Sequence, residues 1–427
     1  MRASYLRERV RTGFWFIPLM AVLTSWVVSA LMHRLDIALG GDRPAFLAYD
    51  GDSAQAAQVL STIAGSTLTF TGIVFSITAV ALQLGSSQFS PRALRNFLRD
   101  RGTQWALGLL VATFTYALAT LRYVDPSPEG DAVATPGLSV TLALMLVVAS
   151  LIGFVFFVNH LAQSIRVVSI IERVAAETRT ALRETMPLAD PVPLPDAPDR
   201  PPDQVVTWER APAVVLGYDE DDLVEIARSS DAVLRFVRQV GDYVPSHAPV
   251  VEVWRTDRAQ APIDARAVLR RIGGGIERTM AQDPMFGFRQ LVDIGEKALS
   301  PAINDPTTAV QVIDRLHDLL RRIATRPEPT GAYADATGTV RLVVPLPAWR
   351  DAVELACNEI RHFGASSVQV PRRLRAMFDD LLTVTTADQA AVLHEQTELL
   401  DRAVDRAFED PYDRAICRHP DHQGMGS

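Results

Sequence analysis

Cysteine and lysine are nearly absent from this chain of 427 residues. Its two cysteines, Cys357 and Cys417, are too few for a disulfide framework or a thiolate metal site. A single lysine, Lys297, stands against 41 arginines, which we interpret as a genomic bias toward arginine. The sequence also lacks His, Cys and Asp residues at metal-ligand spacing, a nucleotide-binding loop, and a nucleophile paired with a base. We therefore expect no metal, no cofactor and no enzymatic activity.

Charged side chains are missing from four long stretches, at residues 14–32, 53–90, 102–121 and 132–159. Each stretch has about the 20 residues that an α-helix needs to cross the hydrocarbon core of a bilayer. The sequence therefore predicts an integral membrane protein with a lipid bilayer as its partner. Four transmembrane helices are expected in a domain of residues 1–164, at about residues 14–33, 56–84, 104–123 and 137–160.

Basic residues gather on one side of the predicted spans. They lie in the N-terminal flank and in the loop after the second span, as Arg2, Arg7, Arg9, Arg11, Arg92, Arg95, Arg99 and Arg101. Cytoplasmic loops carry such an excess, so both termini are expected in the cytoplasm. Residues 165–427 carry 31 basic and 41 acidic residues, a net charge of −10. That balance argues against nucleic acid as a partner.

The second charge-free stretch carries a stripe of small and polar residues at alternating spacings of three and four. This spacing places them on one face of a helix. Close helix–helix packing is one interpretation, because small residues let backbones approach. A pore-lining face in an oligomer is the other, and the two are compatible. The members of the stripe are Thr62, Gly65, Thr69, Gly72, Ser76, Ala79 and Gln83.

A short amphipathic helix is expected directly after this span, because Ser90 is a good N-cap and Pro91 a good first residue. Its arginines, Arg92, Arg95 and Arg99, share one face. They are expected to bind anionic lipid headgroups. If the second span lines a pore, the same arginines would surround its inner mouth.

The remaining sequence predicts an α+β cytoplasmic domain that contains a small β unit. We expect a helical extension with a proline-rich linker at 165–204, a β-rich unit at 205–260, a mainly helical domain at 261–411, and a poorly ordered tail at 412–427. Residues 273–275, three glycines, are interpreted as a break rather than a phosphate loop. Residues 340–346 are expected to form a strand and residues 368–370 a possible one.

A dense polar segment lies in the helical part. Asp305 and Pro306 form a cap and a first helical residue, so the segment is expected to contain an elbow between two helices. The alternative is a cytoplasmic polar pocket built from Arg289, Ser300, Asn304 and Asp305.

Three motifs carry a resemblance to a known family. They are Phe70-Thr71-Gly72-Ile73-Val74-Phe75-Ser76 continuing to Ser90-Pro91-Arg92, Gln282-Asp283-Pro284, and Leu299-Ser300-Pro301-Ala302-Ile303-Asn304-Asp305-Pro306-Thr307-Thr308-Ala309. With its membrane architecture, the chain resembles the bacterial DUF2254 family of predicted membrane proteins over most of its length. The resemblance implies a multi-pass protein of the bacterial cytoplasmic (inner) membrane, and it transfers no catalytic residues.

Two functional hypotheses follow. The first is a homo-oligomeric channel or pore-like protein, in which the second span supplies the pore face and the cytoplasmic domain gates or filters an ion of unknown identity. The second is a membrane-anchored sensor or scaffold, whose cytoplasmic domain binds a small ligand or a protein partner.

Overall fold

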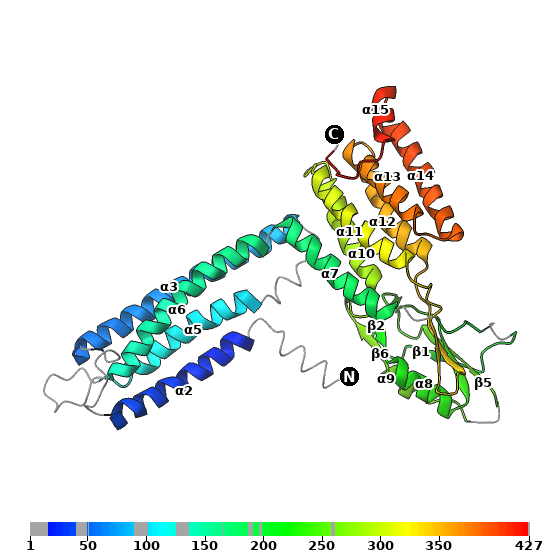
Figure 1. Ribbon diagram of the computed structural model, residues 1–427. Coiled ribbons are helices and arrows are strands. Elements are labelled where there is room, and N and C mark those ends of the chain that lie inside the picture. Colours follow the sequence, from blue (N-terminus) through cyan, green and yellow to red (C-terminus); the bar gives the residue numbers. More distant parts are fainter. Residues whose placement is uncertain are drawn as a thin grey trace. The chain divides into compact units, whose positions relative to one another are not determined.

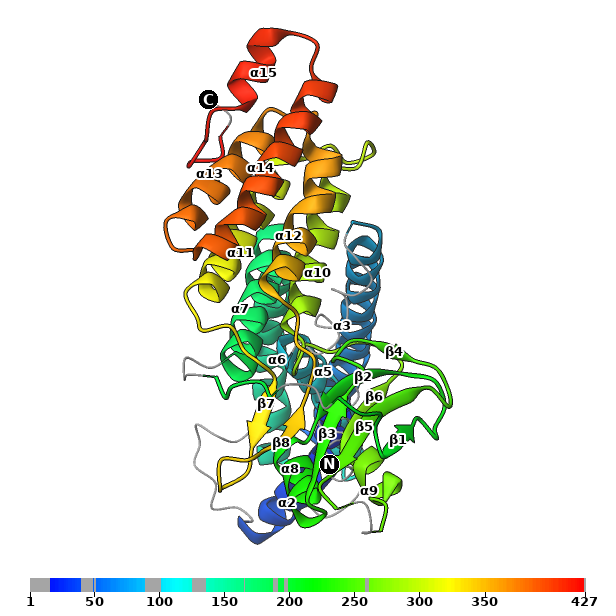
Figure 2. The same cartoon turned by 90° about the vertical axis from the view of Figure 1, so that its right-hand side faces the viewer.

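The structure is a computed structural model, and it describes residues 16–39, 49, 51–88, 101–124, 136–164, 166–186, 191–195, 199–257 and 261–425. Two compact units make up the chain, Met1–Ser169 and Ile170–Ser427. The elements of each unit can be followed in Figures 1 and 2.

The first unit confirms the four predicted membrane helices (Figure 1). Each is long and apolar enough to span a bilayer. All four extend beyond the predicted bounds at one end or both, where charged or polar residues continue the helix. The helices are α2 (Phe16–Leu39), α3 (Ser53–Gln88), α5 (Arg101–Leu121) and α6 (Gly137–Ser164).

Helix α5 packs against each of the other three membrane helices. Small hydroxyl side chains join it to its neighbours: the Thr115 hydroxyl lies 2.6 Å from that of Ser25 on α2, and the Thr113 hydroxyl lies 2.8 Å from that of Ser150 on α6. Hydrogen bonds of this kind and close packing of small residues hold membrane helices together, because lipid offers no hydrophobic driving force. Buried Tyr116 fills the space among these helices.

The second unit begins within α7 and contains two small sheets (Figure 2). One sheet has the order β1-β5-β3-β8-β7 and the other β4-β2-β6. All pairings are antiparallel except that of β3 with β8. The elements are α7 (Val167–Thr185), β1 (Gln204–Thr207), β2 (Ala213–Tyr218), α8 (Glu220–Ser229), β3 (Ala232–Phe236), β4 (Tyr243–Val244), β5 (Pro249–Arg255), α9 (Ala265–Arg270), β6 (Ile272–Gly275), β7 (Ala332–Ala334) and β8 (Val340–Val343).

The glycine run 273–275 is not a break, as we had expected, but forms most of strand β6. It pairs with β2, and a side chain on Gly274 would meet the ring of Trp208. The run is a strand because only glycine allows this close approach. The β structure also extends beyond 205–260, since β7 and β8 come from a hairpin far along the chain.

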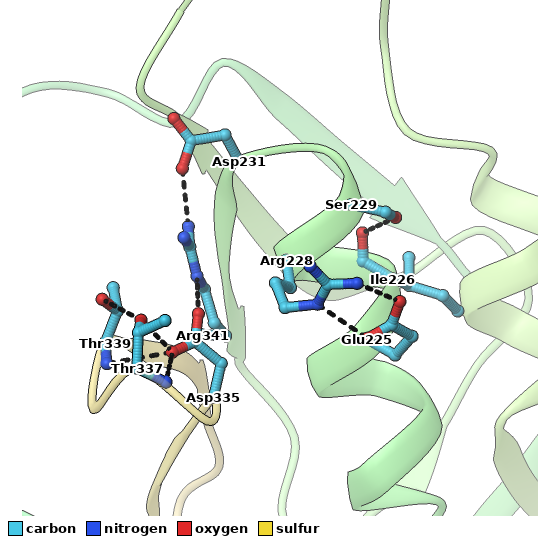
Figure 3. Close-up of polar contacts among 9 residues, drawn as sticks. All are labelled: Glu225, Ile226, Arg228, Ser229, Asp231, Asp335, Thr337, Thr339 and Arg341. Atoms are coloured by element: carbon cyan, nitrogen blue, oxygen red, sulfur yellow. Dashed lines mark hydrogen bonds and ion pairs between the residues drawn. The ribbon is translucent and has the colours of Figure 1, made fainter.

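The turn of that hairpin is held by Asp335 and Arg341 (Figure 3). The Asp335 carboxylate accepts hydrogen bonds from the Thr337 and Thr339 backbone and, at 2.8 Å, from the Arg341 guanidinium. Arg341 also donates to Asp231, 2.8 Å away, at the start of β3. These bonds hold the pKa of Asp335 well below its ordinary value, first through Arg341. The contacts explain how a distant hairpin joins the sheet.

Helices make up the rest of the second unit. Residues 368–370 do not form the possible strand, because Gln369 begins α13 and Pro371 lies in its first turn, where proline is tolerated. Trp349 begins another helix, in the part of the chain where the sequence predicted a mainly helical domain. The helices are α10 (Pro284–Ala298), α11 (Pro306–Ala324), α12 (Trp349–Gly364), α13 (Gln369–Leu382), α14 (Ala387–Ala407) and α15 (Pro411–Cys417).

The expectation of a poorly ordered tail is wrong for residues 411–425. Asp410 caps α15 by accepting a 2.7 Å hydrogen bond from the Tyr412 N–H. Beyond α15 the chain returns to α13, where the Asp421 N–H donates to the Arg372 carbonyl at 3.1 Å. Cys417 is fully buried. The tail is ordered because it adds to the helical core.

Candidate functional site

The stripe of small and polar residues on α3 faces away from the rest of its unit. All seven members are exposed: Thr62, Gly65, Thr69, Gly72, Ser76, Ala79 and Gln83. No described atom lies within 4 Å of the position that a Cβ would occupy at Gly65 or Gly72. The stripe therefore makes no packing contact within the described part of a single copy.

The opposite side of α3 packs into the bundle. Ala64, Thr67, Val74 and Thr78 are buried there, and Phe70 meets Phe154 of α6 edge-on at 5.3 Å. Helix α3 thus makes its contacts inside the copy with a face that mixes small side chains with larger ones.

The outward faces of α2 and α6 differ in character from that of α3. Their exposed side chains are large and apolar, as lipid-facing residues are. Examples on α2 are Leu19, Leu23, Val27 and Leu31, and examples on α6 are Leu144, Val148, Leu151, Val155 and Phe156. Among the outward helix faces that the structure describes, α3 is the one with a stripe of glycine, alanine, serine, threonine and glutamine.

The stripe carries hydroxyls and an amide but no charge. The Thr62 hydroxyl donates to the Gln58 carbonyl at 2.8 Å, and the Thr69 hydroxyl donates to the Gly65 carbonyl at 3.0 Å. These two hydroxyl donors are satisfied within the helix, while their oxygen lone pairs remain able to accept from water or a neighbouring helix. Arg92, Arg95 and Arg99, predicted for the exit of this helix, lie outside the described residues.

A buried carboxylate joins the ends of two membrane helices. Asp36 on α2 is 2% exposed. It accepts hydrogen bonds from the Leu138 and Ser139 N–H groups at 2.9 and 3.1 Å, and from the Ser139 hydroxyl at 2.6 Å. These groups lie in the first turn of α6, whose positive dipole end favours an anion. Asp36 therefore caps a helix other than its own.

Arg289, a candidate for the cytoplasmic pocket, lies in an ion-pair cluster. Its guanidinium contacts Asp293 and Glu296 of α10 and donates at 2.8 Å to Glu359 of α12. The hydrogen bond from Arg289 is the first cause that lowers the pKa of Glu359. The pKa of Glu296 is raised by burial and by the charge of Glu359. The cluster ties α10 to α12.

The other three pocket candidates form the elbow between α10 and α11. Asp305 caps α11, accepting from the Thr308 N–H at 3.0 Å, and Asn304 is in the left-handed region with φ of 49°. The Ser300 hydroxyl donates to the Lys297 carbonyl. From Arg289 to the end of α10 the helix rises roughly 14 Å. The structure therefore brings Ser300, Asn304 and Asp305 together, with Arg289 bound to carboxylates elsewhere.

The motif Gln282-Asp283-Pro284, which carried part of the family resemblance, joins strand β2 to helix α10. The Gln282 side chain accepts from the Tyr218 N–H at 2.8 Å and donates to the Tyr218 carbonyl at 3.1 Å, as a strand neighbour would. Asp283 caps α10 through the Phe286 N–H, and Pro284 is the first helical residue. The capping pattern was visible in the sequence, whereas the partner of Gln282 was not.

A polar network between α11 and α13 was missed by the sequence analysis. The two ring nitrogens of His317 lie 2.7 Å from an Asp380 carboxylate oxygen and 3.0 Å from an Arg373 nitrogen. Arg373 also donates to Asp314 at 2.6 Å, and Arg321 donates to Asp380 at 2.6 Å. A signal existed, since residues 314, 317 and 321 share one helix face. In the described ranges, no group of three His, Cys, Asp or Glu residues could hold a metal ion.

Comparison with known proteins adds a family. The family model for a predicted membrane protein (DUF2254) matches residues 11–380. Uncharacterised proteins of Mycobacterium bovis and Mycobacterium tuberculosis are each 31% identical over 426 residues, which cover 97% of this chain and 80% of theirs. None of the solved structures matches this chain. The extent of these matches shows that the chain belongs to the DUF2254 family of predicted membrane proteins.

Proposed function

We propose that this protein is a homo-oligomeric channel of the bacterial inner membrane, in which the α3 stripe of each copy lines a shared path. Both termini and the second unit lie in the cytoplasm in this proposal. The supporting observation is the contrast between outward faces: α2 and α6 expose large apolar side chains, whereas α3 exposes the stripe between large apolar side chains such as Leu68 and Ile73. A helix face that contacts only lipid does not require a stripe of small and polar residues.

The composition of the stripe favours a path for water or ions rather than a dry contact between helices. Hydroxyl and amide groups recur along it at Thr62, Thr69, Ser76 and Gln83, separated by small residues that leave room. Exposed Phe75 and Ile73 flank the stripe on its two sides, where neighbouring copies would pack. Without charge on the described stripe, selection among ions would come from pore width or from residues beyond it.

Recording from purified protein in planar bilayers tests this proposal. The native chain should produce discrete conductance steps under tension, voltage or a salt gradient. Gly72→Leu would place a bulky side chain in the path and should abolish them, while Ile73→Leu, an exposed neighbour beside the stripe, should retain them. Stable bilayers without conductance for the native chain, or equal conductance in both variants, would count against a channel.

A second candidate is a membrane-anchored sensor whose cytoplasmic unit binds a small ligand at the elbow. Asn304 favours it, because an exposed residue held in the left-handed region often marks a functional loop. Asn304→Gly keeps the backbone conformation and removes the amide. This candidate expects a cellular small-molecule extract to raise the melting temperature of the native chain but not of the variant, with no conductance in either.

A further inference from the structure

We propose that Arg361, Arg402 and Arg406 form a binding site for a phosphate-bearing ligand at the adjacent ends of α12 and α14. Arg361 lies in the last turn of α12, and Arg406 lies in the last turn of α14. The two helices pack side by side, as Figure 2 shows. Trp349, Arg350 and Asn358 of α12 contact Gln389, Glu395 and Gln396 of α14 in the same order, so the two helices run parallel. Their C-terminal ends therefore lie together.

The three arginines lack the carboxylate partners that other arginines here have. Among the arginines of α12 and α13, Arg350 pairs with Glu395 at 2.7 Å, Arg373 pairs with Asp314 at 2.6 Å, and Arg375 pairs with Asp401. Within the residues that the structure describes, Arg361, Arg402 and Arg406 have no ion pair.

A neutral amide holds Arg361 in place. Its terminal nitrogen donates to the Asn358 side-chain oxygen at 3.2 Å, and Gln396 of α14 donates to the same oxygen at 3.2 Å. This contact orients the guanidinium without neutralising it. The Arg361 Nε is buried and has no hydrogen-bond partner in the described chain. A buried donor of this kind calls for an acceptor, because leaving it unpaired is costly.

Two other arginines act electrostatically on the Arg361 guanidinium. Burial, together with the charges of Arg406 and Arg402, lowers the pKa of the Arg361 guanidinium. Arginine keeps its charge even so, since its pKa is far above neutral. A dianionic phosphoryl group would relieve the repulsion and accept several hydrogen bonds at once, which is how arginine clusters recognise phosphate.

A second buried atom without a hydrogen-bond partner narrows the chemical class of the ligand. The side-chain oxygen of Gln396 is buried and accepts no hydrogen bond from any described residue, and Gln396 is only 2% exposed. Gln396 and Arg361 bind the same Asn358 oxygen, and an unpaired acceptor at this place suits a ligand that also offers a hydroxyl donor. The chemistry points to a phosphate group on a hydroxyl-bearing molecule, whether a soluble phosphorylated compound or a phospholipid headgroup such as that of phosphatidylglycerol.

A simpler role must be separated from this one. Positive side chains at helix C-termini are stabilised by the helix dipole. In that role the arginines would stabilise the fold with no ligand, and their replacement would lower the melting temperature. In an anion site they repel each other until the anion binds, so replacement of Arg402 or Arg406 should leave the ligand-free melting temperature unchanged or raise it.

The test is calorimetric titration of sodium pyrophosphate into the full-length protein in detergent, at constant ionic strength. We expect saturable binding that Arg361→Gln weakens at least tenfold and that Arg402→Gln and Arg406→Gln each weaken severalfold. Arg402 and Arg406 are exposed, so these two variants should fold even if Arg361→Gln does not. The matched control is Arg228→Gln, an exposed arginine that pairs with Glu225 on α8 (Figure 3) and should bind as the native chain does.

A second arm distinguishes the two sources of the phosphate group. Vesicles of phosphatidylglycerol are compared with vesicles of phosphatidylcholine in the same protein. Stabilisation by the former that Arg402→Gln removes, without pyrophosphate binding, would assign the site to a lipid headgroup. The proposal is overturned if neither probe binds, if all variants bind as the control does, or if the arginine variants melt lower in the absence of ligand and bind normally.

Discussion

The Asp36 carboxylate on α2 and the Ser139 hydroxyl on α6 lie 2.6 Å apart, at a helix N-terminus inside the membrane unit. Asp36 also accepts from two backbone N–H groups of that turn. Water cannot readily replace such a cap, because Asp36 is almost fully buried. The pair therefore fixes where α6 begins relative to α2.

Removing this cap should destabilise the membrane unit. We expect Asp36→Ala to cost about 2 kcal/mol or more, because two buried N–H groups lose their acceptor. Ser139→Ala removes one hydrogen bond of the carboxylate and should cost about 1 kcal/mol. Thermal unfolding in detergent measures both. Equal stability of Asp36→Ala and the native chain would show that the contact does not hold the helices.

The Arg289 cluster should contribute stability that depends on pH. Because Arg289 lowers the pKa of Glu359 in the folded state, this contribution is present above the ordinary value of 4.5 and is lost as pH falls through the lowered one. Both side chains are partly exposed, so the coupling in a double-mutant cycle of Arg289→Gln and Glu359→Gln should be about 1 kcal/mol at pH 7.5. The cycle should approach zero at acid pH. Coupling that is unchanged with pH would argue against the ion pair.

His317 should make the second unit sensitive to mild acid. Burial lowers the pKa of His317 below 6.5, with further lowering by Arg373 and opposition from Asp380. Below pH 6.5 the unfolded chain binds a proton that the folded chain does not, so stability falls as pH falls from 7 toward 5. Melting temperatures at pH 7.5 and 5.5 should differ less for His317→Gln than for the native chain. The same difference in both would assign the acid sensitivity to other groups.

Two glycines of α10 should respond in opposite ways to the same substitution. A Cβ at Gly287 would overlap the Thr178 side chain of α7, whereas a Cβ at Gly295 would come no closer than 3.3 Å to Val312. Alanine favours a helix by about 1 kcal/mol over glycine. Gly295→Ala should therefore be neutral or stabilising, and Gly287→Ala should be destabilising by about 1–3 kcal/mol. Unfolding in denaturant compares the two, and equal values would contradict this packing.

The membrane helices could be predicted because their signal is local, whereas their ends could not. A run without charge is visible in the sequence, but α2 continues through Asp36 because the partner of that carboxylate lies about 100 residues away. The stripe on α3 was likewise visible as a periodicity. Which face packs inside the copy depends on α5 and α6, so its outward direction could come only from the structure.

The second unit shows the same division between local and distant signals. The caps at Asp283 and Asp305 can be predicted from the sequence, because each is an acidic residue directly before a proline. Strand β6 was wrongly predicted to be a break, because three glycines have no strand preference of their own. They form a strand here because they pair with β2. The Arg361 site and the His317 network join residues from separate helices. Spacing along one helix cannot reveal such partners.

Cysteine accessibility along α3 tests the central claim most directly. Cys357 and Cys417 would be replaced, and single cysteines placed at Thr69, Gly72 and Ser76 on the stripe, with Ile73 and Phe75 as exposed controls beside it. A small water-soluble thiol reagent is applied to protein in sealed vesicles. A water-filled path predicts labelling at the three stripe positions and protection at the two controls. Protection at all five positions would contradict it and would leave the stripe as a dry contact between helices.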